Sequence, residues 1–502
     1  MATEARGNGA ALRIAIIGSG FSGIGMAIRL RRMGIDSFTL YEAAESLGGT
    51  WRDNAYPGAA CDIPSHLYSF SFELNPAWTR TYAPQQEILD YLRHCARKYD
   101  VERFIEYRSR VRAARFVEAR RVWQVEIERG QADGATNALD TIEADIVIAA
   151  HGPLSRPSLP HIPGIERFEG KVFHSARWDH DYALEGKRIA VIGTGASAIQ
   201  FVPQVQPHVA RLAVFQRTPP WIMPRRDRAI GARWRWIFRH VPLAQRAARA
   251  AIYWQLESRA LGFSVEPRLL KTPTKFARSY LAHKVKDPEL RARLTPDYLL
   301  GCKRVLLSSD YYPALAQPNV ELVTEAIREV VPDGIVTADG THRAFDAIVC
   351  GTGFQVNDVD VPFQVTGAGG RDLGETWRRD GPEAYLGASV AGFPNLFFMI
   401  GPNTALGHNS MIYMIESHIG YIAGCIRALQ RSGARTMDVR AEAQRAWNMR
   451  LQARFARTVW QSGCHSYYLT QAGKNTALWP GFTFMFRRKT RRVRRADYAF
   501  GR

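Results

Sequence analysis

Two patterns of hydrophobic and polar positions alternate along the chain: short apolar runs and longer stretches with helical spacing. Five apolar runs are four to six residues long: 12–17, 38–41, 145–149, 188–192 and 212–215. Runs of this kind are typical of parallel strands that are covered on both faces. Helical spacing appears at 24–30 and 86–99, where apolar residues recur every three or four positions. The pattern predicts an α/β fold with parallel sheets.

The first apolar run leads directly into a glycine loop, Gly18-Ser19-Gly20-Phe21-Ser22-Gly23. Gly18 allows a tight turn, Gly20 lets the backbone approach a pyrophosphate, and Gly23 lets the following helix touch the strand. The run 38–41 then ends at Glu42, an acid placed to accept hydrogen bonds from a ribose diol. Strand, loop, helix, strand and acid in this order predict a dinucleotide site.

The same pattern occurs again after residue 188, where the apolar run leads into Gly193-Thr194-Gly195-Ala196-Ser197-Ala198. Glu42 follows Gly18 by 24 positions, and Arg217 follows Gly193 by the same 24 positions. A carboxylate repels a phosphate, whereas an arginine fork pairs with a 2′-phosphate. The sequence therefore predicts FAD at the first site and NADPH at the second.

From about residue 221 to 300 this rhythm is replaced by basic helical patterns, which cover Arg233–Arg239, Ala244–Leu256 and Glu289–Leu294. We favour a helical insertion that packs on its own domain with its arginines solvated. A basic amphipathic segment resting on an anionic membrane surface stays open as the alternative.

Strand patterns return at 345–350 and 393–400, each followed by a turn of small residues. The predicted fold class is α/β, with two Rossmann-like dinucleotide-binding domains, for FAD and NADPH, and the helical insertion in the NADPH domain. The predicted boundaries are 1–152 for the first FAD segment, 153–350 for the NADPH domain with its insertion at about 221–300, and 351–502 for the second FAD segment.

The net charge of the chain bears on which kinds of partner it could bind. The 502 residues include 67 Lys and Arg against 47 Asp and Glu, a formal net charge of +20. Much of the excess lies in 225–249 and in 487–495, and the second run is expected to be a disordered or surface tail. No nucleic-acid partner is expected, although a non-enzymatic binder of membranes or nucleic acid is the alternative that this charge suggests.

Six cysteines are scattered without a Cys-x-x-Cys pair. A zinc site, a disulfide scaffold and a redox dithiol are therefore not expected, which argues against a disulfide reductase and for a reducing cytosol. Because the N-terminus lacks a signal-peptide core and no run of 18 apolar residues occurs, a cytoplasmic protein with at most peripheral membrane association is expected.

Three further segments carry a family resemblance. They are Gly48-Gly49-Thr50-Trp51 with Cys61-Asp62, the linker Phe168-x-Gly170-x-x-x-His174-x-x-x-Trp178-Asp179, and Gly301-Cys302-Lys303-Arg304. Together with both glycine loops they resemble the type I (class B) Baeyer–Villiger flavin monooxygenases, which are related to flavin-containing monooxygenases. The resemblance covers nearly the whole chain.

The resemblance implies a role for individual residues. Arg304 would sit over the flavin with Asp62 paired to it, and His174 and Trp178 would position and couple the two domains. Besides the first glycine loop and Glu42, the implied FAD contacts are Gly49, Thr50, Trp51, Asp62, Tyr68, Val111 and Met411. The implied NADPH contacts are Gly193, Thr194, Gly195, Ala196, Ser197, Arg217, Thr218 and Lys303. No metal is implied.

The reaction that the resemblance implies begins when NADPH reduces FAD. Reduced flavin takes up O2 at C4a, and the peroxide inserts one oxygen next to a ketone carbonyl to give an ester or lactone. The nearest alternative is a flavin-containing oxygenase that attacks nitrogen or sulfur in soft nucleophiles through the C4a-hydroperoxide. The physiological substrate and the oligomeric state are not predicted.

Overall fold

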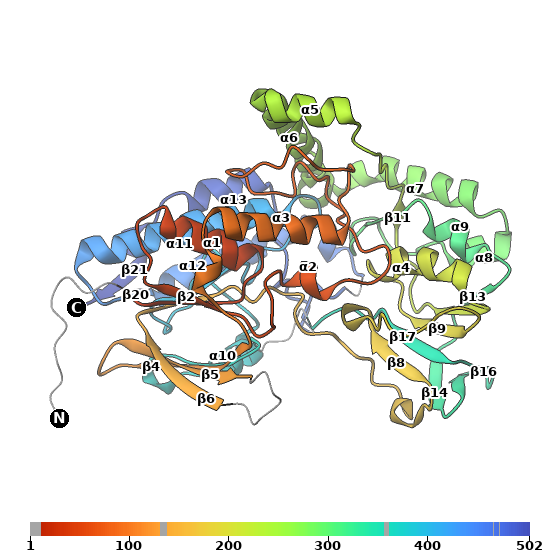
Figure 1. The fold of residues 1–502 in the computed structure, drawn as a ribbon, viewed down its shortest axis with the longest axis horizontal. Helices are drawn as coiled ribbons and strands as arrows, with labels where there is room; N and C mark the ends of the chain where they lie inside the picture. The colour runs from red at the N-terminus through yellow and green to blue at the C-terminus, as the bar shows by residue number, and fades with distance from the viewer. Residues whose placement is uncertain (1–11, 131–137, 356–360, 465, 471) are drawn as a thin grey trace.

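The computed structural model describes residues 12–130, 138–355, 361–464, 466–470 and 472–502, and it contains two parallel sheets side by side (Figure 1). The first sheet has the strand order β19-β7-β1-β2-β3. Its strands are β1 (Ile14–Ile17), β2 (Phe38–Tyr41), β3 (Ile105–Glu106), β7 (Ile146–Ala149) and β19 (Leu396–Phe398). All neighbours in this sheet pair in parallel.

Both faces of the first sheet are covered, which explains its unbroken apolar runs. Ile14 and Ile16 pack with helix α1 (Phe21–Arg31) and helix α11 (Met411–Ser432) on one face. Ala15 and Ile17 face an antiparallel layer on the other side. That layer contains β4 (Ser109–Val117), β5 (Val122–Arg129) and β6 (Ala138–Ala144), with β18 (Gln364–Thr366) parallel to β4.

The second sheet has the order β13-β10-β9-β17-β8, again with parallel neighbours. Its strands are β8 (Lys171–His174), β9 (Arg188–Ile192), β10 (Arg211–Phe215), β13 (Val320–Val323) and β17 (Ala347–Cys350). Helices α4 (Ala198–Val205) and α9 (Tyr311–Leu315) cover one face, and the strands β14 (Ile327–Val331), β15 (Gly334–Thr337) and β16 (His342–Ala344) lie on the other. The predicted α/β fold with two dinucleotide-type sheets is confirmed.

The helical insertion contains α5 (Ala232–His240), α6 (Pro242–Glu257), a π-helical turn at Leu261–Val265, α7 (Lys271–Lys284) and α8 (Pro288–Arg293). Its helices α5 and α6 project at the top of the molecule in Figure 1, and its helices α7 and α8 lie at the right. The end of α6 is buried, as expected. Helix α5 packs less closely than α6: none of its residues, all of which the structure describes, is fully buried, although Phe238 contacts His66 and the arginines are exposed as expected.

Of the two alternatives expected for 487–495, a disordered or a surface tail, the structure agrees with a surface segment and not with a disordered one. Helix α13 (Thr483–Thr490) packs on α11 with Phe486 and Thr490 buried, and β21 (Tyr498–Gly501) pairs with β20 (Thr436–Val439). The dense run of charges at 487–495 gave no sign that buried residues lie beside and within it.

The remaining elements are short or peripheral. They are α2 (Thr50–Asp53), α3 (Gln85–Lys98), β11 (Ile222–Met223), β12 (Leu306–Leu307), α10 (Leu373–Asp380) and α12 (Ala441–Phe455).

Candidate functional site

The first glycine loop has the shape of a phosphate cradle. Gly18 has φ +104°, and a Cβ there would lie 2.9 Å from the carbonyl oxygen of Ala150. A Cβ on Gly23 would lie 2.0 Å from the oxygen of Gly18, whereas a Cβ on Gly20 would meet nothing closer than 3.8 Å. Helix α1 starts at Phe21 without a side-chain cap, so its first N–H groups are available to an anion. The loop therefore fits a pyrophosphate.

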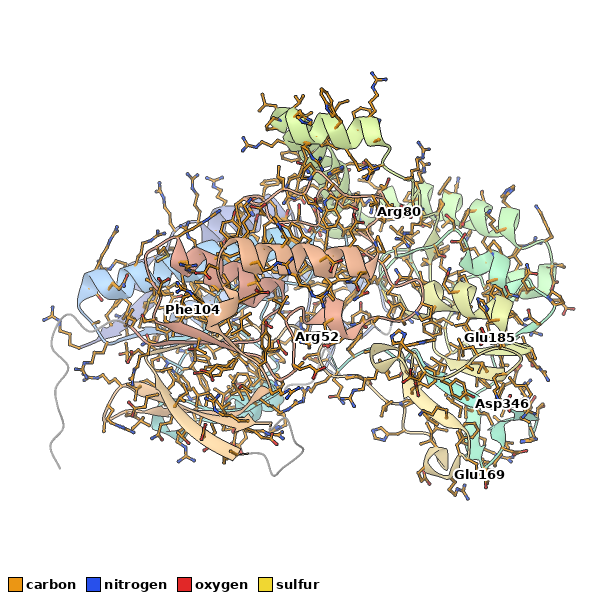
Figure 2. All side chains as sticks on the ribbon, in the orientation of Figure 1. Arg52, Arg80, Phe104, Glu169, Glu185 and Asp346 are labelled. Atoms are coloured by element: carbon orange, nitrogen blue, oxygen red, sulfur yellow. A yellow bond between two sulfur atoms is a disulfide. The ribbon has the colours of Figure 1, made fainter. Side chains whose placement is uncertain are left out.

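Glu42 lies beside this loop, buried at the end of β2. Its carboxylate accepts hydrogen bonds from the N–H of Ser19 at 3.0 Å and from the Ser19 hydroxyl at 2.7 Å. Arg52, labelled in Figure 2, makes an ion pair with the same carboxylate at 3.0 Å. Val111 lies nearby on β4, where the N–H of Ser109 donates to the Glu42 carbonyl at 2.8 Å.

An aromatic cluster closes the other side of the loop. The indole N–H of Trp51 donates to the hydroxyl of Tyr68 at 3.1 Å, and both Trp51 and Phe21 pack edge-on against the Tyr68 ring. Gly49 brings Thr50 and Trp51 close to the loop, because a Cβ on Gly49 would lie 3.3 Å from the Cα of Gly20. The predicted FAD contacts Gly20, Gly49, Trp51 and Tyr68 therefore meet in one place.

Met411 also lies close to this group, because it is the first residue of α11 and the start of that helix contacts the segment before Tyr68. The side chain of Ser410 caps the helix by accepting from the N–H of Ile412, and its hydroxyl donates to the carbonyl of Leu67 at 3.4 Å. The positive end of the α11 dipole therefore lies beside the residue that precedes Tyr68.

The second glycine loop repeats the geometry of the first. Gly193 has φ +106°, and a Cβ there would lie 2.5 Å from the oxygen of Gly351, while Gly195 and Ala196 are exposed. Ser197 precedes α4. The hydroxyl of Thr194 donates to the carbonyl of Thr218 at 3.4 Å, which joins the loop to the segment after β10.

Two cations lie together beyond that segment. Burial and the charge of Arg217 lower the pKa of Lys303, although Arg217 and Lys303 are 86 positions apart in the chain. Neither makes an ion pair with any residue in the described ranges, and the Lys303 ammonium lies 4.7 Å from the ring centre of Tyr298. Asp297 is close enough to oppose part of this shift in the Lys303 pKa, but it forms no ion pair with either cation in the described chain. Two neighbouring cations without an ion-paired acid suit an anionic group such as a 2′-phosphate.

Arg304 and Asp62 form an ion pair between the two halves of the site. About a third of each side chain is accessible, 35% for Arg304 and 31% for Asp62. Burial opposes the ionisation of Asp62, but the Arg304 charge and hydrogen bond outweigh it and lower the Asp62 pKa. The same carboxylate raises the pKa of Arg304. Both groups are therefore charged at neutral pH.

A small pocket, too narrow in this structure to hold a water molecule, lies at Arg304 and Lys303, and the sequence did not predict its other walls. They include Phe263, Gly407, Trp460 and Tyr468. Aromatic residues in the irregular stretch 459–468 were the signal that could have pointed to them. A second hollow, at the opposite edge of the first sheet beside Arg13 and Asp36, lies away from both glycine loops.

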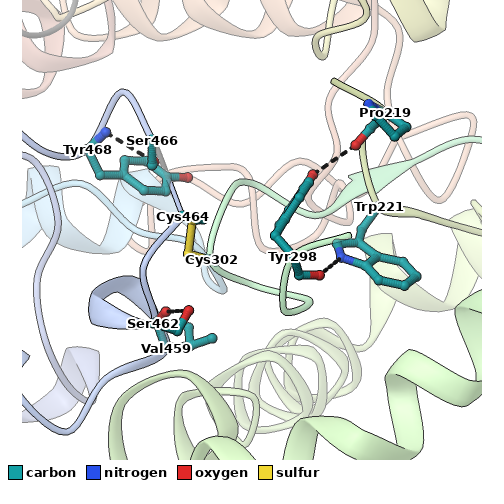
Figure 3. Close-up of a disulfide and its surroundings, with 9 residues drawn as sticks. All are labelled: Pro219, Trp221, Tyr298, Cys302, Val459, Ser462, Cys464, Ser466 and Tyr468. Carbon is teal, nitrogen blue, oxygen red and sulfur yellow. Dashed lines mark hydrogen bonds between the residues drawn. A yellow bond between two sulfur atoms is a disulfide. The ribbon is translucent and has the colours of Figure 1, made fainter. Parts of the chain in front are cut away.

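The scattered cysteines did not lead us to expect a disulfide scaffold, but the structure contains one disulfide. Cys302 and Cys464 form a disulfide with their Cα atoms 6.3 Å apart, and Figure 3 shows it between the segment that precedes Arg304 and the loop that carries Tyr468. The other four cysteines are buried thiols. Spacing along the sequence could not reveal the pair, because the fold brings together residues 162 positions apart.

His174 and Trp178 are close to the second sheet and do not line the Arg304 pocket as the structure describes it. The Nδ1 of His174 accepts from the N–H of Ala176 at 3.0 Å, whereas its buried Nε2 has no hydrogen-bond partner among the described residues. Burial lowers the His174 pKa. Trp178 packs against Phe173 and Phe201.

Gln200, which the sequence did not indicate, links the two halves. Its side-chain oxygen accepts from the Tyr56 hydroxyl at 2.9 Å, and its amide donates to the carbonyl of Ala60 at 2.9 Å. Because Gln200 is on α4, directly after the second glycine loop, it joins that loop to the segment leading to Asp62.

Comparison with known proteins agrees with this geometry. Residues 11–241 match the family model described as flavin-binding monooxygenase-like. A Baeyer–Villiger monooxygenase of Streptomyces coelicolor is 51% identical over 97% of this chain and 92% of its own length. Among solved structures, an oxidized steroid monooxygenase bound to NADP has a TM-score of 0.84 at 30% identity, covering 98% of this chain and all of that one. A complex of OTEMO with FAD and NADP has a TM-score of 0.84 at 27% identity, covering 96% and 97%.

Proposed function

The chain belongs to the Baeyer–Villiger monooxygenase family, and from that membership we propose how its own residues divide the work. It is an NADPH-dependent flavin monooxygenase that inserts one oxygen atom of O2 next to a ketone carbonyl, giving an ester or lactone. Its cofactors are FAD and NADPH, and bound FAD, once reduced, supplies the activation of oxygen.

Arg304 stabilises the negative charge that develops on oxygen as the ketone is attacked. The observation that carries this proposal is the ion pair with Asp62 at the wall of the pocket. A guanidinium that is held in place in a part-buried site acts on such charge more strongly than mobile water does. Asp62 keeps the guanidinium oriented and charged.

The remaining predicted residues bind and align the two cofactors. Glu42 accepts from the ribose of FAD in exchange for some of its present donors, and the cradle of Gly18, Gly20 and Gly23 holds the pyrophosphate. Arg217, Thr218 and Lys303 bind the 2′-phosphate of NADPH, a role supported by the closeness of two cations that form no ion pair in the described chain. His174, whose Nε2 lacks a partner in the described chain, and Trp178 position the link between the domains.

The domain boundaries at residues 152 and 350 remain part of this proposal. They are supported by the strands of the second sheet, which lie between Lys171 and Cys350, and by β19, which returns to the first sheet.

The proposal is tested by NADPH consumption with a panel of ketones, sulfides and amines, measuring ester or lactone against hydrogen peroxide release. Arg304→Ala is expected to lower ester formation by about a hundredfold or more while NADPH still reduces FAD. Arg278→Ala, an exposed arginine stacked on Trp221, is the matched control. Normal ester formation by Arg304→Ala would overturn the assignment, and sulfoxide or N-oxide as the dominant product would overturn the ketone preference.

A further inference from the structure

The helical insertion carries an exposed aromatic and basic surface that the oxygenation reaction does not explain. Of the sixteen exposed large hydrophobic residues in the described chain, nine lie between residues 234 and 276. They include the three exposed tryptophans, Trp234, Trp236 and Trp254, at 58%, 60% and 59% exposure. Leu243, on the next helix, is 73% exposed. Apolar side chains are therefore concentrated on this part of the surface.

The inner side of the insertion is anchored to the body of the protein. Arg249 of α6 donates to the carbonyl of His66 at 2.8 Å, and Gln245 donates to the carbonyl of Asn75 at 2.6 Å. The ring of Phe238 on α5 packs on His66 with centroids 4.5 Å apart. These contacts fix which side of α5 and α6 faces outward, and Figure 2 shows the outer side chains of α5 projecting away from the body.

The outer side is basic as well as aromatic. Residues 228–256 contain no Asp or Glu, while α5 carries Arg233, Arg235 and Arg239, all exposed. Trp beside Arg on one surface is the composition of segments that lie in the interface of an anionic bilayer.

We propose that the outer face of α5 and α6 docks on an anionic lipid bilayer. Trp236 and Leu243 enter the interface, Trp234, whose ring stacks on Phe238, lies at its edge, and Arg233 and Arg235 contact lipid headgroups. Charge complementarity favours this occupant, because the face is wholly basic and the protein has a net charge of +20. Within the described chain, no helix is both long and apolar enough to cross a membrane, so the contact is with the surface.

The test is cosedimentation of the full-length, FAD-loaded protein with vesicles of phosphatidylcholine alone or mixed with phosphatidylglycerol. We expect binding to the anionic vesicles, weakened by added salt. The pair Arg233→Gln and Arg235→Gln should weaken it at least about tenfold, because each basic residue near an anionic leaflet contributes roughly a factor of five. The pair Trp234→Ser and Trp236→Ser should weaken it comparably.

Matched controls remove the same groups elsewhere on the surface. They are Arg491→Gln with Arg492→Gln for charge, and Leu139→Ser with Leu159→Ser for exposed apolar area. The proposal is overturned if the unmodified protein stays in the supernatant at low salt, or if the controls weaken binding as much. It is also overturned if gel filtration shows a dimer that the tryptophan pair converts to a monomer. Binding needs no turnover, so failure here is distinct from failure of the proposed chemistry.

Discussion

The guanidinium of Arg304 is ion-paired with the carboxylate of Asp62, although 242 positions separate them in the chain. Arg304 follows the insertion that extends from the second sheet, and Asp62 follows the first glycine loop. The pair therefore joins two segments that are far apart in the chain and fixes the position of the guanidinium.

Asp62→Asn tests whether this pairing matters for the reaction. The substitution keeps the shape of the side chain but removes the charge, so Arg304 becomes less well oriented. Ester formation is expected to fall roughly ten- to a hundredfold, corresponding to the loss of a charged hydrogen bond, while peroxide release rises. Asp227→Asn, which breaks the surface ion pair with Arg80, is the control and should change little. Equal losses in the two variants would contradict the role of Asp62.

The proposed role of Arg217 and Lys303 predicts that the enzyme prefers NADPH to NADH. If both contact the 2′-phosphate, Arg217→Ala should raise KM for NADPH roughly tenfold or more and leave KM for NADH nearly unchanged. The matched variant is Arg211→Ala, which removes an arginine at the opposite end of the same strand, paired with Glu321 at 2.6 Å. A parallel rise of both KM values would mean that Arg217 acts through the fold and not through the phosphate.

Much of this architecture was predictable because buried parallel strands and glycine loops leave local signals. The strands Phe38–Tyr41 and Arg188–Ile192 have the bounds that their apolar runs predicted. Glu42 and Arg217 could be placed because each ends a strand at a fixed distance from its glycine loop. These features can be read from the sequence because the turn, the ribose contact and the phosphate contact each restrict the residue type at their position.

The pocket walls could not be predicted in the same way. Phe263, Gly407 and Tyr468 come from three segments without periodicity, and only the folded chain brings them to Arg304. The exposure of α5 was missed for a related reason, since its amphipathic pattern does not say whether protein, lipid or water covers the apolar side.

The Cys302–Cys464 disulfide predicts a thiol count. Denatured, unreduced protein should titrate four thiols, and reduced protein six. Cys464→Ser should reduce the stability of the fully oxidised protein by about 2–4 kcal/mol, because the link closes a long loop of the unfolded chain. Six thiols without reductant would contradict the disulfide, and a stability loss that persists under reductant would assign the effect to the substitution itself.

Glu257, at the end of α6, accepts hydrogen bonds that join the insertion to the first domain, and we expect their contribution to stability to depend on pH. Its 1% exposed carboxylate accepts from the hydroxyl of Thr483 at 2.8 Å, from the N–H of Thr483 at 2.5 Å and from the amide of Asn409 at 2.5 Å. Burial opposes ionisation of Glu257, but His408 and these donors outweigh it and lower the Glu257 pKa below the ordinary 4.5.

A lowered folded-state pKa means that the carboxylate stabilises the fold above about pH 4.5 and loses this effect as the pH falls through the folded-state value. Glu257→Gln should lower the free energy of unfolding by about 2 kcal/mol at neutral pH, because a hydrogen of the new side-chain amide would face the groups that now donate to the carboxylate. The loss should appear as a fall in Tm of a few degrees. The difference from the unmodified protein should shrink on acidification. Glu266→Gln, an exposed acid nine residues away in the same insertion, should show no such difference at either pH. A Glu257→Gln deficit of equal size at neutral and acidic pH would assign the effect to packing instead of charge.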